Sequence, residues 1–243
     1  MNYYIGIGIL LPFIGTMMGV LTALFLKNGL KKWINHLLLG FSSGVMIAAS
    51  IWSLIIPSIN LTDSFIEASI GFTLGFLLLL IIDKFIKTIE NKNSNMLMFS
   101  VTLHNIPEGM AVGVGLSALL NSNNLFSLAS VLSLALGIAI QNIPEGAIIS
   151  LPLKNKGYGN KKSLGFGFIS AVVEPIAAIL TIMLINYVVP LMPYLLSLAA
   201  GTMFYVVINE LIPESQSGEL KNVGTIGFLI GFLIMMILDV TLG

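Results

Sequence analysis

Residues 66–87 read IEASIGFTLGFLLLLIIDKFIK, and this stretch decides the class of fold. It is long enough to cross the roughly 30 Å hydrocarbon core of a bilayer as one helix. A helix is also the only single-segment structure that satisfies its own backbone hydrogen bonds in lipid. Seven further apolar runs follow the same pattern, so we expect an all-α membrane protein with eight transmembrane helices. The expected spans lie near 3–26, 34–57, 66–87, 95–119, 126–151, 163–186, 191–213 and 222–242.

The composition of the 243 residues also indicates a chain surrounded by lipid. Hydrophobic residues make up 56% and charged residues 9%, with a mean hydropathy of +0.99, whereas soluble domains carry about 25% charged residues. This excludes a soluble enzyme, and a net charge of +0 speaks against nucleic acid as a partner. The lack of cysteine excludes a disulfide scaffold. We expect residues 1–243 to form a single transmembrane domain in the lipid bilayer, without an organic cofactor.

The lysines predict how the chain is oriented in the membrane. All 11 basic residues are lysines, and they fall in alternate connections: 1–2, 3–4, 5–6 and 7–8. The positive-inside rule then places the N and C termini outside. In a prokaryote, this pattern indicates the cell membrane, that is, the plasma or inner membrane.

Two sequence repeats indicate internal symmetry. The sequence GFTLGFL at 71–77 in span 3 returns as GFLIGFL at 227–233 in span 8. HNIPEG at 104–109 in span 4 returns as QNIPEG at 141–146 in span 5. In both pairs the two spans cross in opposite directions, so we expect a 3+2+3 inverted-repeat arrangement, which is typical of secondary transporters. For the first repeat, a chance match of residues common in membrane helices is the alternative.

Three glutamates lie about halfway along spans 4, 5 and 6: Glu108, Glu145 and Glu174. A charged side chain at the bilayer centre costs on the order of 2.5–3.5 kcal/mol on insertion scales. The three are therefore expected to face one another, which they tolerate only when protonated or when holding a cation. For any one of them alone, a structural hydrogen bond is the alternative.

Helical spacing places further polar side chains beside these glutamates. An imidazole together with amide and carboxylate oxygens suits divalent metals such as Zn²⁺, Fe²⁺ or Mn²⁺, and Cd²⁺ is a further candidate. The two asparagines in the set could equally serve only to hold helices together. The predicted metal-binding residues are His104, Asn105, Glu108, Gln141, Asn142, Glu145 and Glu174.

Other acids lie away from the midplane. Asp83, Glu210 and Asp239 are candidate pathway residues, because a cation that leaves the midplane needs oxygen ligands along its route. Asp83 could instead simply pair with Lys84 or Lys87.

At these residues the chain resembles the ZIP (Zrt/Irt-like) divalent metal transporter family, in particular its compact bacterial GufA-like branch. The resemblance covers essentially the whole chain and is carried by HNIPEG at 104–109, QNIPEG at 141–146, Glu174-Pro175 and NELIPE at 209–214. It implies metal influx into the cytoplasm, a homodimer, and a mobile bundle of spans 1, 4, 5 and 6 that moves against spans 2, 3, 7 and 8.

The resemblance also implies a binuclear metal centre. One position would use His104, Glu108, Gln141 and Glu145, the other Asn105, Asn142 and Glu174, with Glu108 and Glu145 bridging. The chain departs from many relatives in having Gln141 where they have histidine, which weakens the case for strict zinc selectivity. The short connection 88–95 also lacks the histidine-rich loop of many members.

The sequence thus predicts a carrier of divalent metal and not an enzyme. Carboxylates lose protons when they bind metal, so uptake is expected to slow as the external pH falls. Two alternatives stay open. One is an intramembrane metallo-hydrolase, although the second histidine of the His-Glu-x-x-His motif is missing. The other is a proton-coupled carrier of another solute that uses the carboxylates as a relay.

Overall fold

The computed structural model describes residues 2–25, 31–89, 95–120, 127–155 and 159–242. Nearly all of these residues are helical and none of them lies in a β-strand, which confirms the prediction of an all-α chain. Seven helical segments of this described part are long and apolar enough to cross a membrane. Helix α5 (Asn95–Leu120) has 26 residues, and its portion Asn105–Leu120 is a further apolar segment. The chain is a multi-pass membrane protein.

The remaining helices lie close to the expected ranges, with one clear shift. We expected the seventh span to begin near residue 191, yet α8 begins at Ile185 and follows α7 after Leu184 alone. Pro190 and Pro193, which would usually end a helix, lie inside α8. The helices are α1 (Asn2–Phe25), α2 (Lys32–Ala49), α3 (Ile56–Thr62), α4 (Phe65–Ile89), α6 (Leu128–Asn155), α7 (Asn160–Met183), α8 (Ile185–Val206), α9 (Ile212–Ser215) and α10 (Lys221–Leu242).

Helices α2 and α8 each continue into a short π-helical segment. These segments are η1 (Ser50–Ile55) and η2 (Val207–Leu211). Each leads into a helix with proline at its second position, Pro57 in α3 and Pro213 in α9. Because proline has no N–H and its ring clashes with the carbonyl four residues earlier, the wider π turn lets the helix continue through it.

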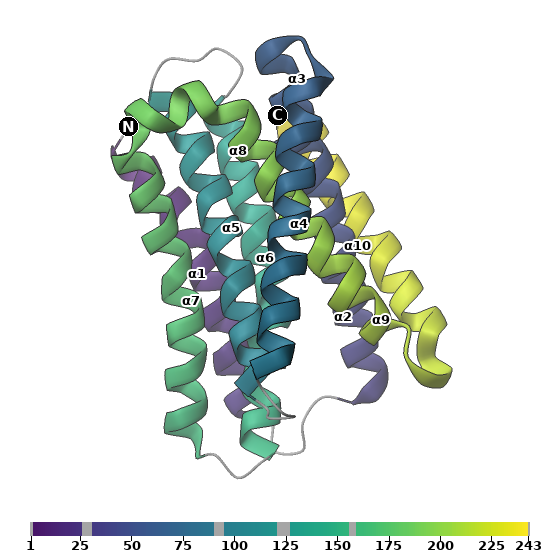
Figure 1. Cartoon of the computed structure of the whole chain (residues 1–243). Coiled ribbons are helices and arrows are strands. Elements are labelled where there is room, and N and C mark those ends of the chain that lie inside the picture. The colour runs from purple at the N-terminus through teal and green to yellow at the C-terminus, as the bar shows by residue number, and fades with distance from the viewer. Residues whose placement is uncertain (1, 26–30, 90–94, 121–126, 156–158, 243) are drawn as a thin grey trace.

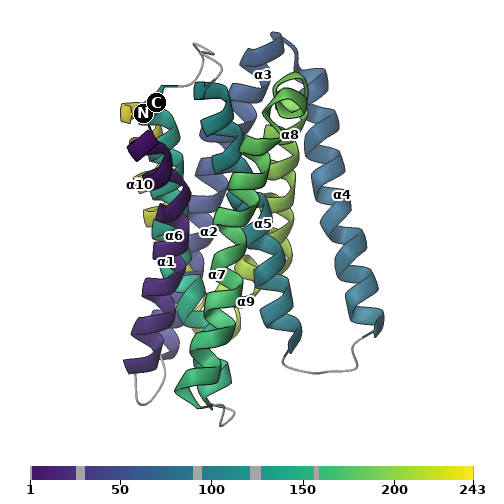
Figure 2. The ribbon, with the colours of Figure 1, turned by 90° about the vertical axis from the view of Figure 1, so that its left-hand side faces the viewer.

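The helices pack as two groups (Figures 1 and 2). In the first group, α1 packs mainly on α6, and α5 mainly on α7. In the second group, α10 packs mainly on α2, and α4 mainly on α8. The groups meet where α5 contacts α8 and where α2 contacts α6. Both chain termini lie at the same end of the bundle (Figure 2).

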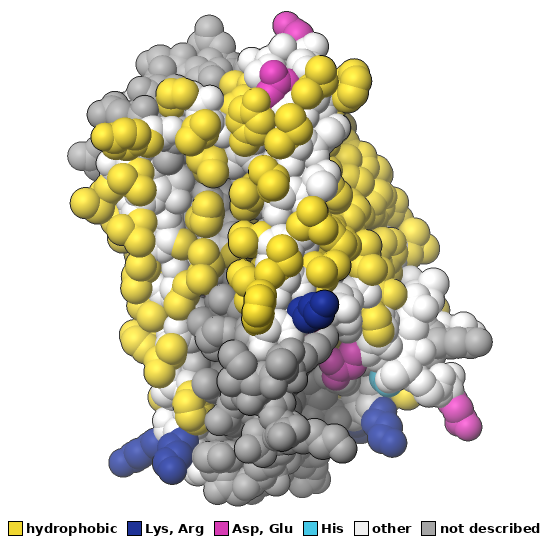
Figure 3. Space-filling model, viewed as in Figure 1, with side chains coloured by type: hydrophobic (Ala, Val, Ile, Leu, Met, Phe, Trp, Pro, Cys, Tyr) yellow, Lys and Arg dark blue, Asp and Glu magenta, His cyan; other side chains and the backbone are white. Residues whose placement is uncertain are grey.

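On the face in Figure 3, hydrophobic side chains cover much of the described surface above the lower end. Large hydrophobic side chains such as Leu74, Ile81, Leu229 and Ile237 are about half exposed along α4 and α10. On the face in Figure 3, the lysine side chains lie in the lower part of the molecule, away from the end that holds the two termini in Figure 1. The apolar belt matches a surface in contact with lipid.

Candidate metal centre

The predicted polar residues of three helices converge inside the first group of helices. Helix α5 contributes Asn105 and Glu108, α6 contributes Gln141, Asn142 and Glu145, and α7 contributes Glu174. None of these six side chains is more than 5% exposed. The side chain of His104, the seventh predicted ligand, lies outside the described residues.

Glycines bring the four helices of this group into backbone contact around the site. A Cβ at Gly109 of α5 would collide with the carbonyl oxygen of Glu174 in α7. A Cβ at Gly146 of α6 would collide with the carbonyl oxygen of Thr16 in α1. Both glycines directly follow a site glutamate, so the residue that permits close packing also fixes the position of the neighbouring carboxylate.

Hydrogen bonds divide the site into two halves. In one half, Gln141 Nε2 donates to Glu108 Oε1 at 2.7 Å. In the other, Asn105 Nδ2 donates to Glu174 Oε1 at 2.9 Å and to the Ser170 carbonyl oxygen at 2.9 Å. The amide of Asn142 lies close to the carboxylates of both Glu108 and Glu174, between the two halves.

Thr16 of α1 is a further member of the site that was not predicted from the sequence. Its hydroxyl donates to Glu174 Oε1 at 2.6 Å, and the side chain is only 1% exposed. Its place in the site could have been predicted, because Thr16 is a polar residue in the middle of an apolar span. Ser42 of α2 also reaches the site from the second group, because its Oγ donates to the Gln141 carbonyl oxygen at 3.1 Å.

Each of the six residues holds a buried oxygen atom that has no hydrogen-bond partner among the described residues. A buried polar atom without a partner costs about 1–3 kcal/mol, so native proteins keep very few of them. Here such atoms gather in one place, and most of the atoms of this kind in the described chain belong to the cluster. The oxygens are Asn105 Oδ1, Glu108 Oε2, Gln141 Oε1, Asn142 Oδ1, Glu145 Oε2 and Glu174 Oε2.

The three carboxylates are close enough for their charges to interact. Glu108 lies within electrostatic range of Glu174, and Glu145 lies within range of both. Buried like charges repel one another strongly, and a proton or a cation between them relieves the repulsion. However, no three His, Asp or Glu side chains of the described residues are grouped tightly enough to hold one ion. A cation bound in this arrangement would therefore also need the amide oxygens.

The three candidate pathway residues lie outside this cluster. Asp239 of α10 accepts hydrogen bonds from Ser53 at 2.8 Å and Ser133 at 3.4 Å. Asp83 of α4 accepts one from the Tyr205 hydroxyl at 2.8 Å. Glu210, in the π segment η2, lies within electrostatic range of both Glu145 and Tyr205.

Fold and site together define an integral membrane protein with an acidic, oxygen-rich site buried among its helices. The family model described as ZIP zinc transporter matches residues 91–239, which is more than half of the chain. The chain belongs to the ZIP family, and its relatives ZIP11 and ZIPB are named as transporters and not as enzymes.

Three relatives show how far the similarity extends. The zinc transporter ZIP11 of Homo sapiens is 34% identical over 148 residues, which cover 61% of this chain and 43% of that protein. The zinc transporter GufA of Myxococcus xanthus is 33% identical over 146 residues, covering 60% and 55%. The zinc transporter ZIPB of Bordetella bronchiseptica is 30% identical over 251 residues, covering 95% and 79%. The chain spans less than half the length of the ZIP11 relatives that it matches.

Proposed function

We propose that this protein carries divalent metal ions, zinc in the first place, across the membrane into the cytoplasm through the buried site. The observation that carries the proposal is the cluster of six buried oxygens without hydrogen-bond partners among the described residues. Oxygen ligands in this number suit a divalent cation, and Fe²⁺, Mn²⁺ and Cd²⁺ are further candidate ions. The relatives named as zinc transporters support zinc as the first choice.

We further propose that the site holds two ions. The division of the hydrogen bonds supports this, because Glu108 pairs with Gln141 and Asn105 pairs with Glu174. His104, Glu108, Gln141 and Glu145 would bind one ion, and Asn105, Asn142 and Glu174 the other. Glu108 and Glu145 would bridge them. To bind an ion, each amide turns its oxygen toward it, so metal replaces the hydrogen bonds now made by the amide nitrogens.

An inverted 3+2+3 arrangement with both termini outside is our proposed topology. It is supported by matching contacts of the repeated sequence at 71–77 and 227–233. Gly71 and Gly75 of α4 pack on the backbone of α8, as Gly227 and Gly231 of α10 pack on α2. The π segments η1 and η2 also occupy corresponding places before proline. On the face in Figure 3 the lysines lie in the half of the molecule away from the termini, which supports the orientation.

Transport requires the site to open to each side in turn. We propose that the group α1, α5, α6 and α7 moves against α2, α4, α8 and α10, because the main packing contacts lie within each group. Asp239 would receive the ion on one side, and Glu210 and Asp83 on the other. Glu210 lies within electrostatic range of Glu145, so its charge would attract an ion that leaves the centre. Assembly as a homodimer is proposed from the family resemblance, and location in the cell membrane from the distribution of the lysines, for a prokaryotic protein.

Zinc uptake into proteoliposomes tests the assignment of the site. Glu108→Gln keeps the shape of the side chain but removes a charge from the centre. It should reduce uptake by at least about tenfold, because even the loss of a hydrogen-bond partner of a metal ligand typically costs about 10–100-fold. Glu219→Gln removes an exposed acid far from the cluster and is the matched control. Uptake at the wild-type rate by Glu108→Gln would end the assignment.

A further inference from the structure

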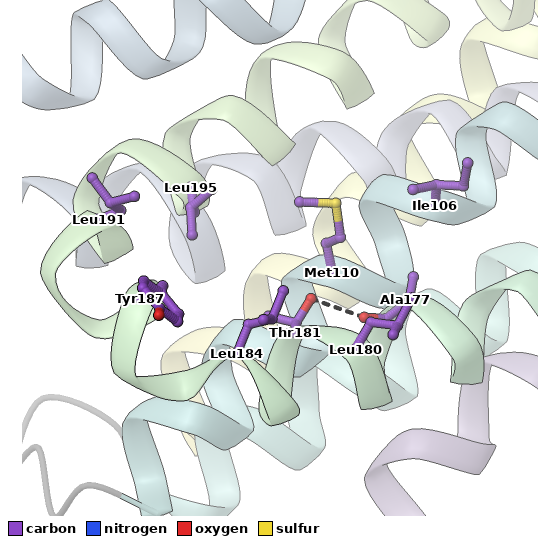
Figure 4. A pocket seen from close by; sticks show the side chains of 9 residues that line it. All are labelled: Ile106, Met110, Ala177, Leu180, Thr181, Leu184, Tyr187, Leu191 and Leu195. Atoms are coloured by element: carbon purple, nitrogen blue, oxygen red, sulfur yellow. Dashed lines mark hydrogen bonds between the residues drawn. The ribbon is translucent and has the colours of Figure 1, made fainter.

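A cavity that shares no lining residue with the polar site opens between α5, α7 and α8 and has a volume of about 360 Å³. Ile106 and Met110 of α5 lie at one end, and Tyr187 and Leu191 of α8 lie at the other (Figure 4). Its volume falls near the lower end of the range for sites that bind small organic molecules, which is about 300–1,000 Å³.

The wall of this cavity has almost no charged or hydrogen-bonding group that could bind a polar ligand. None of the residues that line it is charged. Its one buried hydroxyl, that of Thr181, donates to the Ala177 carbonyl oxygen of its own helix at 2.8 Å, as Figure 4 shows. Tyr187, at one end, is 75% exposed, so its hydroxyl is not confined to the cavity. A wall of this kind selects a neutral hydrocarbon, and apolar cavities of this kind do not hold water well.

The rim of the cavity is continuous with the lipid-facing surface. Leu180, Leu184 and Leu191 line it and are each about half exposed. The lining runs from Ala177 of α7 to Leu184, which directly follows α7, a rise of about 10 Å. This is most of one leaflet's share of a hydrocarbon core that is about 30 Å thick. The groove therefore has the direction, length and polarity of a lipid tail.

We propose that the cavity is a binding site for one acyl chain of a membrane phospholipid. The lipid belongs to the leaflet on the side of the α7–α8 junction, which is the outer leaflet in the orientation proposed above. Its tail lies between α7 and α8 and ends against Ile106 and Met110. Ile106 lies directly between Asn105 and Pro107, so the lipid tail contacts the helix turn that carries the metal-site motif.

The position of this lipid gives it a role in transport, a part of the proposal that rests on the proposed function. The tail contacts α5 and α7 of one helix group and α8 of the other. A lipid that fills this gap favours the arrangement of the two groups seen here. Movement of one group against the other would require the tail to leave or to shift, so the lipid sets part of the barrier to transport.

Photo-crosslinking tests the binding site directly. The whole protein is reconstituted in nanodiscs doped with a phospholipid that bears a diazirine in its acyl chain, and the labelled peptides are mapped by mass spectrometry. The labels should concentrate on the cavity-lining parts of α5, α7 and α8. Labelling in the wild-type protein should be saturable and should be reduced by an excess of unlabelled phospholipid. Even labelling of all lipid-facing helices would overturn the proposal.

Two variants that fill the cavity sharpen the test. Leu180→Trp and Leu191→Trp, made separately, should each reduce labelling of the cavity peptides by about tenfold. Ile179→Trp is the matched control, because Ile179 neighbours Leu180, is 46% exposed and does not line the cavity. Equal labelling of Leu180→Trp and Ile179→Trp would refute the site. The labelling needs no metal, so it is read independently of zinc uptake. The role in transport predicts that zinc uptake changes in the two filling variants and not in Ile179→Trp. Unchanged uptake in the filling variants would refute that role.

Discussion

The substitution Glu174→Gln separates a metal site from a structural hydrogen bond. Glutamine keeps the oxygen that accepts from Thr16 and Asn105 at 2.6 and 2.9 Å, so the local packing should survive. It removes one of three interacting buried charges. It also replaces Oε2, which has no partner among the described residues, by an amide nitrogen that can donate to one of the other unpartnered oxygens of the site. We therefore expect the metal-free variant to be more stable than the wild type, by the roughly 1–3 kcal/mol that a buried atom without a partner costs.

The effect of zinc should be opposite in sign. A ligand present at about 100 times its Kd stabilises a folded protein by about 2.7 kcal/mol. If the lost carboxylate weakens zinc binding tenfold, about 1.4 kcal/mol of this stabilisation disappears. Glu174→Gln should thus raise the melting temperature without zinc and reduce the increase that zinc produces.

Thermal unfolding of the purified protein in detergent, with and without zinc, measures both effects. Glu219→Gln, an exposed acid in the short helix η3 (Gly218–Leu220), should behave as the wild type in both conditions. A variant that loses stability without zinc, and keeps the full shift with zinc, would show that Glu174 is a structural hydrogen-bond acceptor. The reasoning from the clustered oxygens would then be refuted.

Three further substitutions test other parts of the proposal. Gly109→Ala puts a Cβ against the Glu174 carbonyl oxygen. It should lower zinc uptake by about a hundredfold, the effect expected of a displacement of about 1 Å in a preorganised site. Gly6→Ala, with no atom within 4 Å of the added Cβ, should leave uptake unchanged. Thr16→Val removes a buried donor to Glu174 and should cost about 1 kcal/mol of stability in thermal unfolding, whereas Thr22→Val, at an exposed position of the same helix, should cost less. Tyr205→Phe removes the hydroxyl that donates to Asp83 and should slow uptake severalfold with zinc affinity unchanged in a binding titration; altered affinity would contradict a role confined to the pathway.

Some features of the site could be predicted from the sequence, because an isolated charged side chain in lipid raises the free energy of the protein. A carboxylate in hydrocarbon needs a partner, so Glu108, Glu145 and Glu174 could be predicted to meet from their depth alone. Helical periodicity added Asn105, Gln141 and Asn142 to the same faces, and the structure brings all six residues together. The expectation that His104 joins them stays a prediction.

Other features depend on which helices are neighbours. The contact of Gly109 with α7, and of Gly146 with α1, joins residues far apart in the chain, and no local pattern specifies such a pair. Thr16 enters the site for the same reason. The start of α8 at Ile185 could not be read locally either, because proline ends a helix only where neighbouring groups cannot satisfy the freed carbonyls.

The sequence by itself determined that this chain is helical, lies in lipid and buries acids at mid-depth, because the transfer of apolar and charged side chains between water and hydrocarbon is a property of each residue. Only the tertiary structure decided which helices touch, how the hydrogen bonds divide the acids into two halves, and where a hydrocarbon-lined cavity remains between α5, α7 and α8. These depend on distances between residues remote in the chain, and packing sets those distances for the molecule as a whole.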